Sequence, residues 1–407
     1  MEVLYARCAG LDVHAASVVA CVRVAVGGTV TYAHRTVSTT TAGLLDLADW
    51  LTAQGVTHVA LEATGVYWKP VWHVLEDGFT LVLANAKHHR NVPGRKNDKN
   101  DATWIADLLA LGLIRSSFVP PAPIQELRDL TRTRKQLVRE LSRHTQRIQK
   151  TLEDANLKLT EVISDVLGQS GRAILTALVA GETDPARLID LTHGLKASRE
   201  VLLQAVHGRV TPHHRFMIQL HLTQITALET AVAALDARIG DALVPFRAAV
   251  SLLTTMPGVK TTAAAVIVAE IGTDMTRFPT AGHVISWAGL CPRQDASAGK
   301  HRSTRIRKGA PWLKPILIQG AWAAVRGRDR YLRAQFLRLK SRRGPKKAIL
   351  AVAASMLTDV YYMLRDGVEF HDLGDQYFAQ RDKKQITKRL LQRLRDLGVE
   401  VEVKNAA

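Results

Sequence analysis

Four carboxylates in the N-terminal quarter of the sequence have the residue types and the spacing of a metal-ion site. Asp12 lies in the segment "GLDVH", Glu62 ends the apolar segment "HVALE", and Asp98 and Asp101 lie three positions apart in "RKNDKND". Residues at positions i and i+3 share a helix face, so the last two should point the same way. Four hard oxygen ligands in one cleft repel each other unless a divalent cation neutralises them, and Mg²⁺ is the ion that carboxylates and phosphates hold jointly.

Basic residues around the last two acids complete this chemistry. Arg95, Lys96 and Lys99 would draw phosphate groups toward the acids, while the acids hold the metal ion against the phosphate. The structural alternative is that the acids act as caps and as partners of helix dipoles, which is common for Asp and Glu at the ends of elements. Their predicted order along the chain, strand, strand, helix, helix, favours the metal-binding interpretation.

Alternating strands and helices should position the four acids. Three segments rich in β-branched residues lie close together, and Gly27-Gly28 between the second and third has the signature of a hairpin turn. The periodicity then alternates between helical and strand patterns. The sequence therefore predicts an α/β layer with a mixed sheet, in which all four acids could converge at one end. In chain order the segments are strands 5–14, 17–26 and 29–38, helix 40–55, strand 56–63, strand 80–86 and helix 98–113.

Ser297 lies beside the most basic stretch of the chain. Between Lys300 and Lys347 there are sixteen Lys or Arg residues and one acid, Asp329. A hydroxyl that attacks phosphorus needs cationic neighbours to stabilise the developing charge. Taken alone, a serine in "DASAGKHRST" is a solvated loop residue, and only its surroundings favour a catalytic role. The cations closest to it in sequence are Lys300, Arg302, Arg305, Arg307 and Lys308.

The charge balance of the whole chain points to a polyanionic partner. Its 407 residues carry 55 Lys and Arg against 37 Asp and Glu, a net charge of +18 with a pI near 10.1. Such a field concentrates nucleic acid around the surface, and a merely solvated basic surface is the alternative. The three cysteines have neither CxxC nor zinc-type spacing, which argues against a disulfide framework. With no uncharged run of ~18 residues and no export signal after Met1, the sequence predicts a cytosolic protein without a membrane partner.

The middle third predicts a helical arm. Two long helical patterns carry apolar seven-residue rows and should pair as a partial coiled coil around a less regular insertion at about 160–218. The first helix should run from Pro123 to about Leu159, with rows Leu127, Leu141, Ile148 and Leu130, Leu137; the second carries Ile225, Leu228, Val232, Leu235 and Ile239. The basic residues of the first helix form either a solvated face or a nucleic-acid surface; they are Arg128, Arg132, Arg134, Lys135, Arg139, Arg143 and Arg147.

The last third predicts a mainly helical unit. Pro257-Gly258 opens an apolar helix whose amide groups could meet a phosphate, although such a turn is more often only a turn. Trp287, Trp312 and Trp322 lie at apolar helical positions, which favours a place in the core over base stacking.

Several motifs in order resemble the Piv/IS110 family of transposases. In the N-terminal part they are "GLDVH", "LEATG" and "KNDKNDA", and in the C-terminal half "MPGVKTTAAAVIVAEIG", "WAGLCPRQDASAGKHRSTRIRKGAPWL" and "HDLGDQYF". The resemblance covers most of the chain and weakens around 160–218. It implies an RNase H-like (RuvC-like) first domain whose acidic tetrad, Asp12, Glu62, Asp98 and Asp101, binds Mg²⁺. It also implies a nucleophilic serine at Ser297, with Ser303 and Ser286 as the alternative positions.

The combined interpretation is a multidomain α+β DNA recombinase. Its predicted domains are a RuvC-like α/β domain at 1–118, a helical coiled-coil arm at 119–250, a mainly α transposase domain at 251–380 and a tail at 381–407. The family resemblance further implies donor and target DNA as substrates, a bridge RNA guide, a composite site between subunits, and a tetrameric synapse built from dimers. The rival functions are a Mg²⁺-dependent junction resolvase, which needs the acids but no serine, and a non-enzymatic nucleic-acid-binding protein, which needs neither.

Overall fold

The computed structural model describes residues 3–62, 65–84, 98–114, 116–292, 295–297, 300–303, 305–306, 309–381 and 383–399. For residues 98–100, 295–297, 300–303 and 384–386 it describes the backbone alone. The chain divides into two compact units, Met1–Pro120 and Pro121–Ala407. The finer predicted divisions at 250 and 380 stay predictions.

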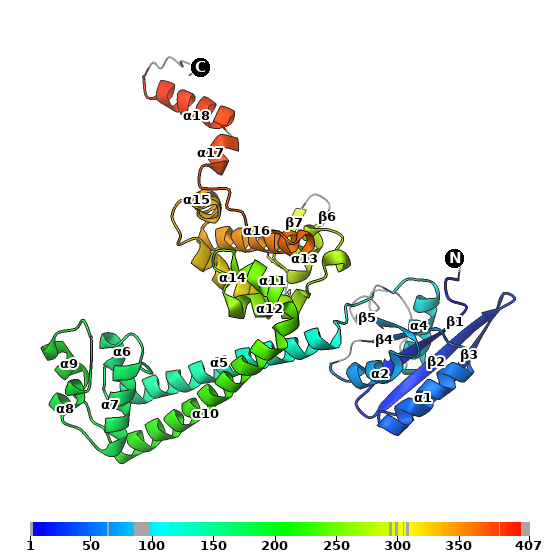
Figure 1. The fold of residues 1–407 in the computed structure, drawn as a ribbon, viewed down its shortest axis with the longest axis horizontal. Helices are drawn as coiled ribbons and strands as arrows, with labels where there is room; N and C mark the ends of the chain where they lie inside the picture. The colour runs from blue at the N-terminus through cyan, green and yellow to red at the C-terminus, as the bar shows by residue number, and fades with distance from the viewer. Residues whose placement is uncertain are drawn as a thin grey trace. The chain divides into compact units, whose positions relative to one another are not determined.

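The first unit is a five-stranded mixed sheet with helices on both faces (Figure 1). The strand order is β3-β2-β1-β4-β5, with β1, β2 and β3 antiparallel and β4 and β5 parallel to β1. This arrangement confirms the predicted mixed sheet. The elements are β1 (Arg7–Val13), β2 (Ser17–Val26), β3 (Thr29–Ser38), α1 (Thr41–Ala53), β4 (His58–Glu62), α2 (Trp68–Leu75), β5 (Thr80–Ala84) and α4 (Asp98–Ala110).

The turn between β2 and β3 has the geometry that its sequence predicts. Gly27 and Gly28 have φ angles of 59° and 84°. A two-residue hairpin of this kind needs positive φ at both central positions, and glycine adopts such angles without steric cost. The hairpin therefore joins two ten-residue strands in unbroken register from Ser17–Ser38 to Val26–Thr29.

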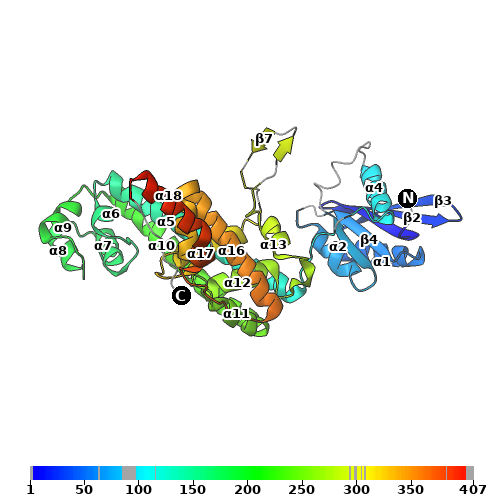
Figure 2. The same cartoon turned by 90° about the horizontal axis from the view of Figure 1, so that it is seen from above.

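The two faces of the sheet are covered by different helices. One face packs aliphatic residues such as Leu11 and Leu61 against α1 and α2. The other face presents smaller buried residues, among them Cys8, Cys21 and Ala60, to α4. Figure 2 shows α4 on the side of the sheet away from α1 and α2. Because Cβ atoms alternate along a strand, every second residue of β1 and β4 lies under α4.

In its described residues, the second unit is helical apart from one short hairpin. Its elements are α5 (Ala122–Asp154), α6 (Leu159–Val162), α7 (Gln169–Ala180), α8 (Pro185–Asp190), α9 (Arg199–Ala205), α10 (Pro212–Ala242), α11 (Arg247–Thr254), α12 (Thr261–Ile271), α13 (Ala281–Ala288), β6 (Asp295–Ser297), β7 (Lys300–Ser303), α14 (Leu313–Ala324), α15 (Tyr331–Arg343), α16 (Pro345–Asp366), α17 (Tyr377–Arg381) and α18 (Lys383–Asp396), with short 3₁₀ turns at Val244–Phe246 and Met275–Arg277.

The long helices α5 and α10 lie side by side and carry α6 to α9 at their far end (Figure 1). The insertion has about the predicted length but begins and ends several residues earlier than predicted, because α5 ends at Asp154 and α10 begins at Pro212. Thr211 caps α10 reciprocally: its hydroxyl accepts from the His214 amide at 3.4 Å, and its own amide donates to His214 Nδ1 at 3.2 Å.

The apolar rows of the two arm helices are only partly buried. Leu127 and Ile239 enter the large core of the second unit, and Ile148 and Ile225 enter a smaller core at the far end. Between these cores, the other predicted row residues are half-buried. Two helices cover only one side of each other, so full burial occurs only where further helices pack against the pair.

The core of the second unit surrounds α16. This helix is long and apolar enough, by length and composition alone, to cross a membrane, with a mean hydropathy of 1.3 in its most apolar window. However, α11, α13, α14 and α15 pack against it, and residues such as Val352, Met356 and Val360 are completely buried. Its apolar character is therefore accounted for by packing inside the unit.

None of the three tryptophans predicted to lie in the core is fully buried. Trp312 is half-buried, and Trp287 and Trp322 expose 41% and 42% of their surface, with their rings near those of Phe278 and Phe336. The turn at Gly258 packs closely against α14: a Cβ there would lie 2.1 Å from the carbonyl oxygen of Gly320. Glycine at this position therefore allows the turn to approach α14 closely.

Candidate functional site

Asp12 and Glu62 occupy matching positions at the carboxyl ends of two adjacent parallel strands. The register between β1 and β4 ends with Leu11 opposite Leu61, and the two acids follow directly. Asp12 is 8% exposed and Glu62 is half-buried. Since side chains alternate along strands, both acids share the face of Ala60, which packs under α4. Sheet pairing thus brings together two residues that are fifty positions apart in the sequence.

Helix α4 begins with the other two acids and lies on the same face. Asp98 is its first residue and Asp101 is half-buried in its first turn. A Cβ on Gly10 of β1 would lie 2.2 Å from the carbonyl oxygen of Ala102 and 2.5 Å from the amide nitrogen of Ala106. The helix therefore touches the β1 backbone one residue after Asp101, because Gly10 has no side chain. The side chain of Asp98 lies outside the described residues.

Polar contacts from β2 and β3 hold α4 in place. Arg23 Nε and the Tyr32 hydroxyl both donate to Asp107 Oδ1, at 2.9 and 2.8 Å. His34 Nε2 lies 2.9 Å from Thr103 Oγ1. Because Arg23 is almost fully buried, its ion pair with Asp107 specifies the register of the helix on the sheet more strongly than an exposed pair would.

His14 is a candidate site residue that the sequence interpretation missed. Its Nε2 lies 3.2 Å from Asp12 Oδ2, and its side chain is 46% exposed. The signal was its position two residues after Asp12, which places both on one side of an extended segment. The imidazole therefore lies against the Asp12 carboxylate at the edge of the candidate site.

The two thiols under α4 are unsuited to nucleophilic chemistry. Cys8 and Cys21 are completely buried, and both are free. Burial raises the pKa of the Cys8 thiol to about 11 and also raises the pKa of Cys21. Both thiols therefore stay protonated at neutral pH and behave as small apolar side chains.

The acids fit a hard divalent cation in their donor chemistry. Asp12 and Glu62 supply carboxylate oxygens from adjacent strands, and α4 adds acids above the same face. Over the described residues, no three His, Cys, Asp or Glu side chains lie close enough together to share one metal ion. Of the tetrad, this statement includes Asp12, Glu62 and Asp101.

Ser297 ends the first strand of the short hairpin in the second unit. β6 and β7 are antiparallel, with Ser297 opposite Lys300 and Asp295 opposite Ser303. The backbone thus places a lysine directly across from the predicted nucleophile. The other predicted serine position, Ser286, is half-buried in α13.

Few of the predicted phosphate-binding side chains fall within the described residues. Arg305 is exposed, and the backbones of Lys99, Lys300 and Arg302 lie in α4 and β7. The remaining members of the set lie outside the described residues; they are Arg95, Lys96, Arg307 and Lys308.

The basic residues of α5 are neither a uniform solvated face nor a uniform binding surface. Arg132 pairs with buried Glu270 on α12, and Arg134 pairs with Asp236 on α10. Arg143 pairs with Glu140 one turn away on its own helix. Arg132 and Arg134 therefore link α5 to α12 and α10 through ion pairs.

Comparison with protein families covers both ends of the chain. A transposase family model, the DEDD transposase of IS110, matches residues 9–157, and a model described as "Transposase IS116/IS110/IS902 family" matches residues 250–337. A relative from Streptomyces coelicolor, the "Insertion element IS110 uncharacterized 43.6 kDa protein", is 34% identical over 147 residues. That match covers 36% of each of the two chains.

The chain belongs to the IS110 family of transposases.

The matched regions of this IS110 family member contain every predicted catalytic residue. Asp12, Glu62, Asp98 and Asp101 lie in the first match, and Ser297 lies in the second. The arm tip and α10 fall between the two matches, a gap that is wider than the region around 160–218 where the resemblance was expected to weaken. The tail motif "HDLGDQYF" lies beyond the second match.

Proposed function

We propose that this protein is a DNA transposase that cuts and rejoins strands through Ser297 and the acids Asp12, Glu62, Asp98 and Asp101. The observation that carries the proposal is the pairing of β1 with β4, which sets Asp12 and Glu62 side by side on the face where α4 begins with two more acids. The letters DEDD in the name of the matching transposase model have the same order of acid types as Asp12, Glu62, Asp98 and Asp101, which supports the proposal.

The acids are proposed to hold Mg²⁺. Bound there, a divalent cation would neutralise the carboxylates and act as a Lewis acid on a phosphodiester oxygen. The chain itself would supply the rest: the sheet fixes two carboxylates, α4 carries the other two acids, and His14 lies against the Asp12 carboxylate. We test this with Asp101→Asn in Mg²⁺. Full recombination by that variant would refute the assignment.

Ser297 is proposed to attack the phosphodiester through Oγ. One P–O bond of the strand breaks as the serine ester forms, so the bond energy is conserved and the strand can be rejoined without a high-energy cofactor. Lys300, opposite it in the hairpin, and the following arginines would stabilise the charge that develops on phosphorus. A hydrolytic nuclease would form no such ester.

Denaturing gels of reactions with end-labelled DNA test the nucleophile. Wild type should form a covalent protein–DNA species, and Ser297→Ala should fold and bind nucleic acid without forming it. An adduct that persists in Ser297→Ala and disappears in Ser303→Ala would move the nucleophile. Cleavage by wild type without an adduct would favour a junction-resolvase type of nuclease.

The proposed partners are donor and target DNA, a bridge RNA that pairs with both, and further copies of the chain. The net charge of +18 supports polyanionic partners but does not distinguish DNA from RNA. The proposed working form is a tetrameric synapse of two dimers in the bacterial cytoplasm. Sequencing the RNA that co-purifies with the protein tests the guide, and recovery of only unrelated cellular RNA would remove that part of the proposal.

A further inference from the structure

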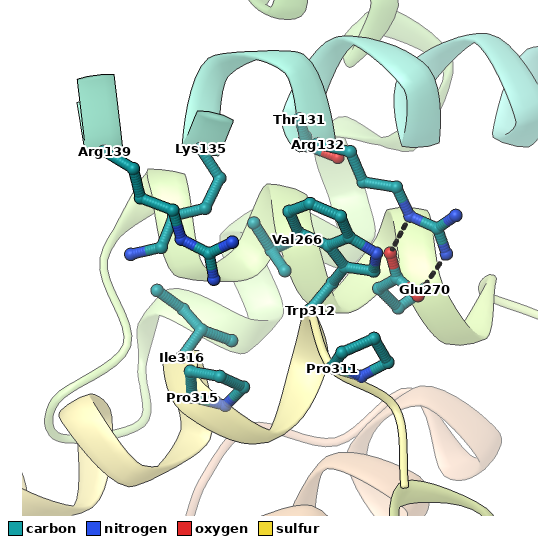
Figure 3. A pocket seen from close by; sticks show the side chains of 10 residues that line it. All are labelled: Thr131, Arg132, Lys135, Arg139, Val266, Glu270, Pro311, Trp312, Pro315 and Ile316. Atoms are coloured by element: carbon teal, nitrogen blue, oxygen red, sulfur yellow. Dashed lines mark hydrogen bonds and ion pairs between the residues drawn. The ribbon is translucent and has the colours of Figure 1, made fainter. Parts of the chain in front are cut away.

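A small pocket lies within the second unit where α5 passes α12 and the start of α14 (Figure 3). The ring of Trp312 forms one wall, and Lys135 and Arg139 reach over it from α5. The cavity measures about 30 Å³. Since a water molecule needs roughly 10–15 Å³ measured in this way, the pocket holds about two water-sized groups. It therefore suits the oxygens of one small polar group and excludes a nucleobase.

The charge of this pocket is not balanced. Arg132 is neutralised by Glu270, to which it donates two hydrogen bonds of 2.8 and 2.9 Å. Across the described part of the unit, neither Lys135 nor Arg139 forms an ion pair with a carboxylate. Glu140, the acid nearest to them in sequence, is paired with Arg143. Two cations one helical turn apart repel each other, so an anion bound between them would be stabilised.

Trp312 holds the arginines of the pocket in place. The guanidinium carbons of Arg132 and Arg139 lie 5.7 and 5.4 Å from the centre of its ring. A guanidinium group over an aromatic ring is attracted by the π electrons and keeps donor N–H groups available at its edges. The ring therefore restricts Arg139 before any ligand arrives, which lowers the entropic cost of binding.

We propose that Lys135, Arg139 and Trp312 form a binding subsite for one phosphodiester group of a nucleic-acid strand. The inference rests on the proposed function, because Trp312 is the fourth residue after Lys308, the last cation of the basic segment that follows Ser297. Four residues span at most about 14 Å, so a strand bound just before Trp312 in the sequence would be within reach of the pocket. Its phosphoryl oxygens would accept hydrogen bonds from the lysine and the arginine. DNA and RNA present the same group, so the strand could be either.

The salt dependence of binding tests the subsite. Binding to a DNA duplex and to a single-stranded RNA of equal length is measured over a range of salt concentrations for the double variant Lys135→Gln/Arg139→Gln. The log–log slope should become shallower by about 0.9 if the subsite binds duplex DNA, or by about 0.7 if it binds single-stranded RNA. The polymer that shows the change identifies the source of the phosphate.

Lys150→Gln is the matched control, because Lys150 is exposed on the same helix and far from the pocket. An equal change in slope for this control would overturn the subsite. An unchanged slope for the double variant on both polymers would also overturn it, and a change of about twice the stated size would mean two separate contacts instead of one shared phosphate. Thermal unfolding of each variant verifies that the fold is intact.

Trp312→Leu separates the subsite from a merely charged surface. This variant keeps both cations and removes the ring that holds Arg139, so affinity should fall several-fold while the salt slope stays the same. Unchanged affinity would remove Trp312 from the subsite and overturn the proposal. These binding measurements need no cleavage, so their outcome is independent of the test for the serine adduct. If wild type forms the adduct but all pocket variants bind as wild type does, the subsite is wrong and the proposed function stands.

Discussion

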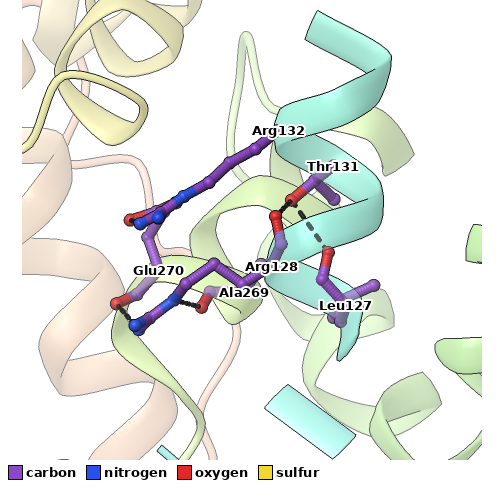
Figure 4. A network of polar contacts seen from close by, with 6 residues as sticks. All are labelled: Leu127, Arg128, Thr131, Arg132, Ala269 and Glu270. Carbon is purple, nitrogen blue, oxygen red and sulfur yellow. Dashed lines mark hydrogen bonds and ion pairs between the residues drawn. The ribbon is translucent and has the colours of Figure 1, made fainter. Parts of the chain in front are cut away.

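Glu270 is a buried carboxylate whose charge is neutralised by one partner, Arg132. It is 2% exposed, Arg132 binds both of its oxygens, and Arg128 donates to the carbonyl oxygens of Ala269 and Glu270 at 2.9 Å (Figure 4). Arg132→Leu would leave the charge buried without a partner, so we expect the free energy of unfolding to fall by about 3 kcal/mol in urea denaturation.

The ion pair between Arg134 and Asp236 is the control for this prediction. It joins the same helix to α10, but the Asp236 side chain is 48% exposed. Arg134→Leu should therefore cost less than about 1 kcal/mol, because water compensates for a lost surface pair. Equal losses in Arg132→Leu and Arg134→Leu would show that burial does not strengthen the dependence on Arg132.

Asp359 makes the stability of the second unit depend on pH. Burial raises the pKa of its carboxyl from 3.8 to about 6. A raised carboxyl pKa means that the folded state binds the proton more tightly than the unfolded chain, so stability falls as pH rises from 3.8 to about 6 and stays lower above that range. Asp359→Asn should remove a cost of at most about 3 kcal/mol at neutral pH and have little effect below the ordinary carboxyl pKa.

Asp366→Asn on the same helix should have the opposite sign. Its partner Arg365 lowers the pKa of the Asp366 carboxyl, so the native state favours the charged form. Unfolding midpoints measured well above and well below pH 6 distinguish the two variants. A stabilisation of Asp359→Asn that is equal at both pH values would contradict the role of its ionisation.

At the scale of elements, the contact between β1 and α4 depends on one missing side chain. Gly10→Ala would place a methyl group 2.2 Å from the backbone of α4, so either the helix or the strand must move. We expect a stability loss of about 1–3 kcal/mol in the first unit, together with loss of strand cleavage, because α4 carries two of the four acids. Gly78→Ala is the control, since a Cβ there meets no atom within 4 Å. Cleavage by Gly10→Ala at the wild-type rate would mean that the position of α4 does not matter.

At the scale of the whole molecule, each of the two units has its own apolar core, so we expect thermal unfolding in more than one step.

Mg²⁺ should stabilise the first unit alone, because it binds the acids only when they are folded together. At a hundredfold excess over Kd, it should raise the free energy of unfolding of this unit by about 2.7 kcal/mol and raise its unfolding temperature accordingly. Calorimetry of Asp12→Asn and Glu62→Gln should show no response to Mg²⁺, while Glu76→Gln, at the end of α2, should respond like wild type. The same shift in all three variants would contradict a site at these acids.

Local sequence determined most of the elements in this protein. β2 and β3 have the predicted bounds, Gly27-Gly28 forms the predicted hairpin, and Glu62 ends a strand as expected. Asp98 begins the predicted helix. These features depend on steric preferences and apolar periods within a few residues, so they are visible in one sequence. The order of the motifs along the chain likewise sufficed to predict the IS110 family, which the family comparisons confirm.

Only the tertiary structure decided which residues meet. The pairing of β1 with β4 places Asp12 beside Glu62, and the close approach of α4 over Gly10 depends on packing between segments about ninety residues apart. Packing between distant segments also distinguishes two arginines of α5 that look alike in the sequence. Arg132 forms an ion pair with Glu270 on α12, whereas Arg139, two turns later, lines the pocket beside the start of α14. Long-range partners are selected by burial and shape, which a local pattern of charges and apolar residues does not contain.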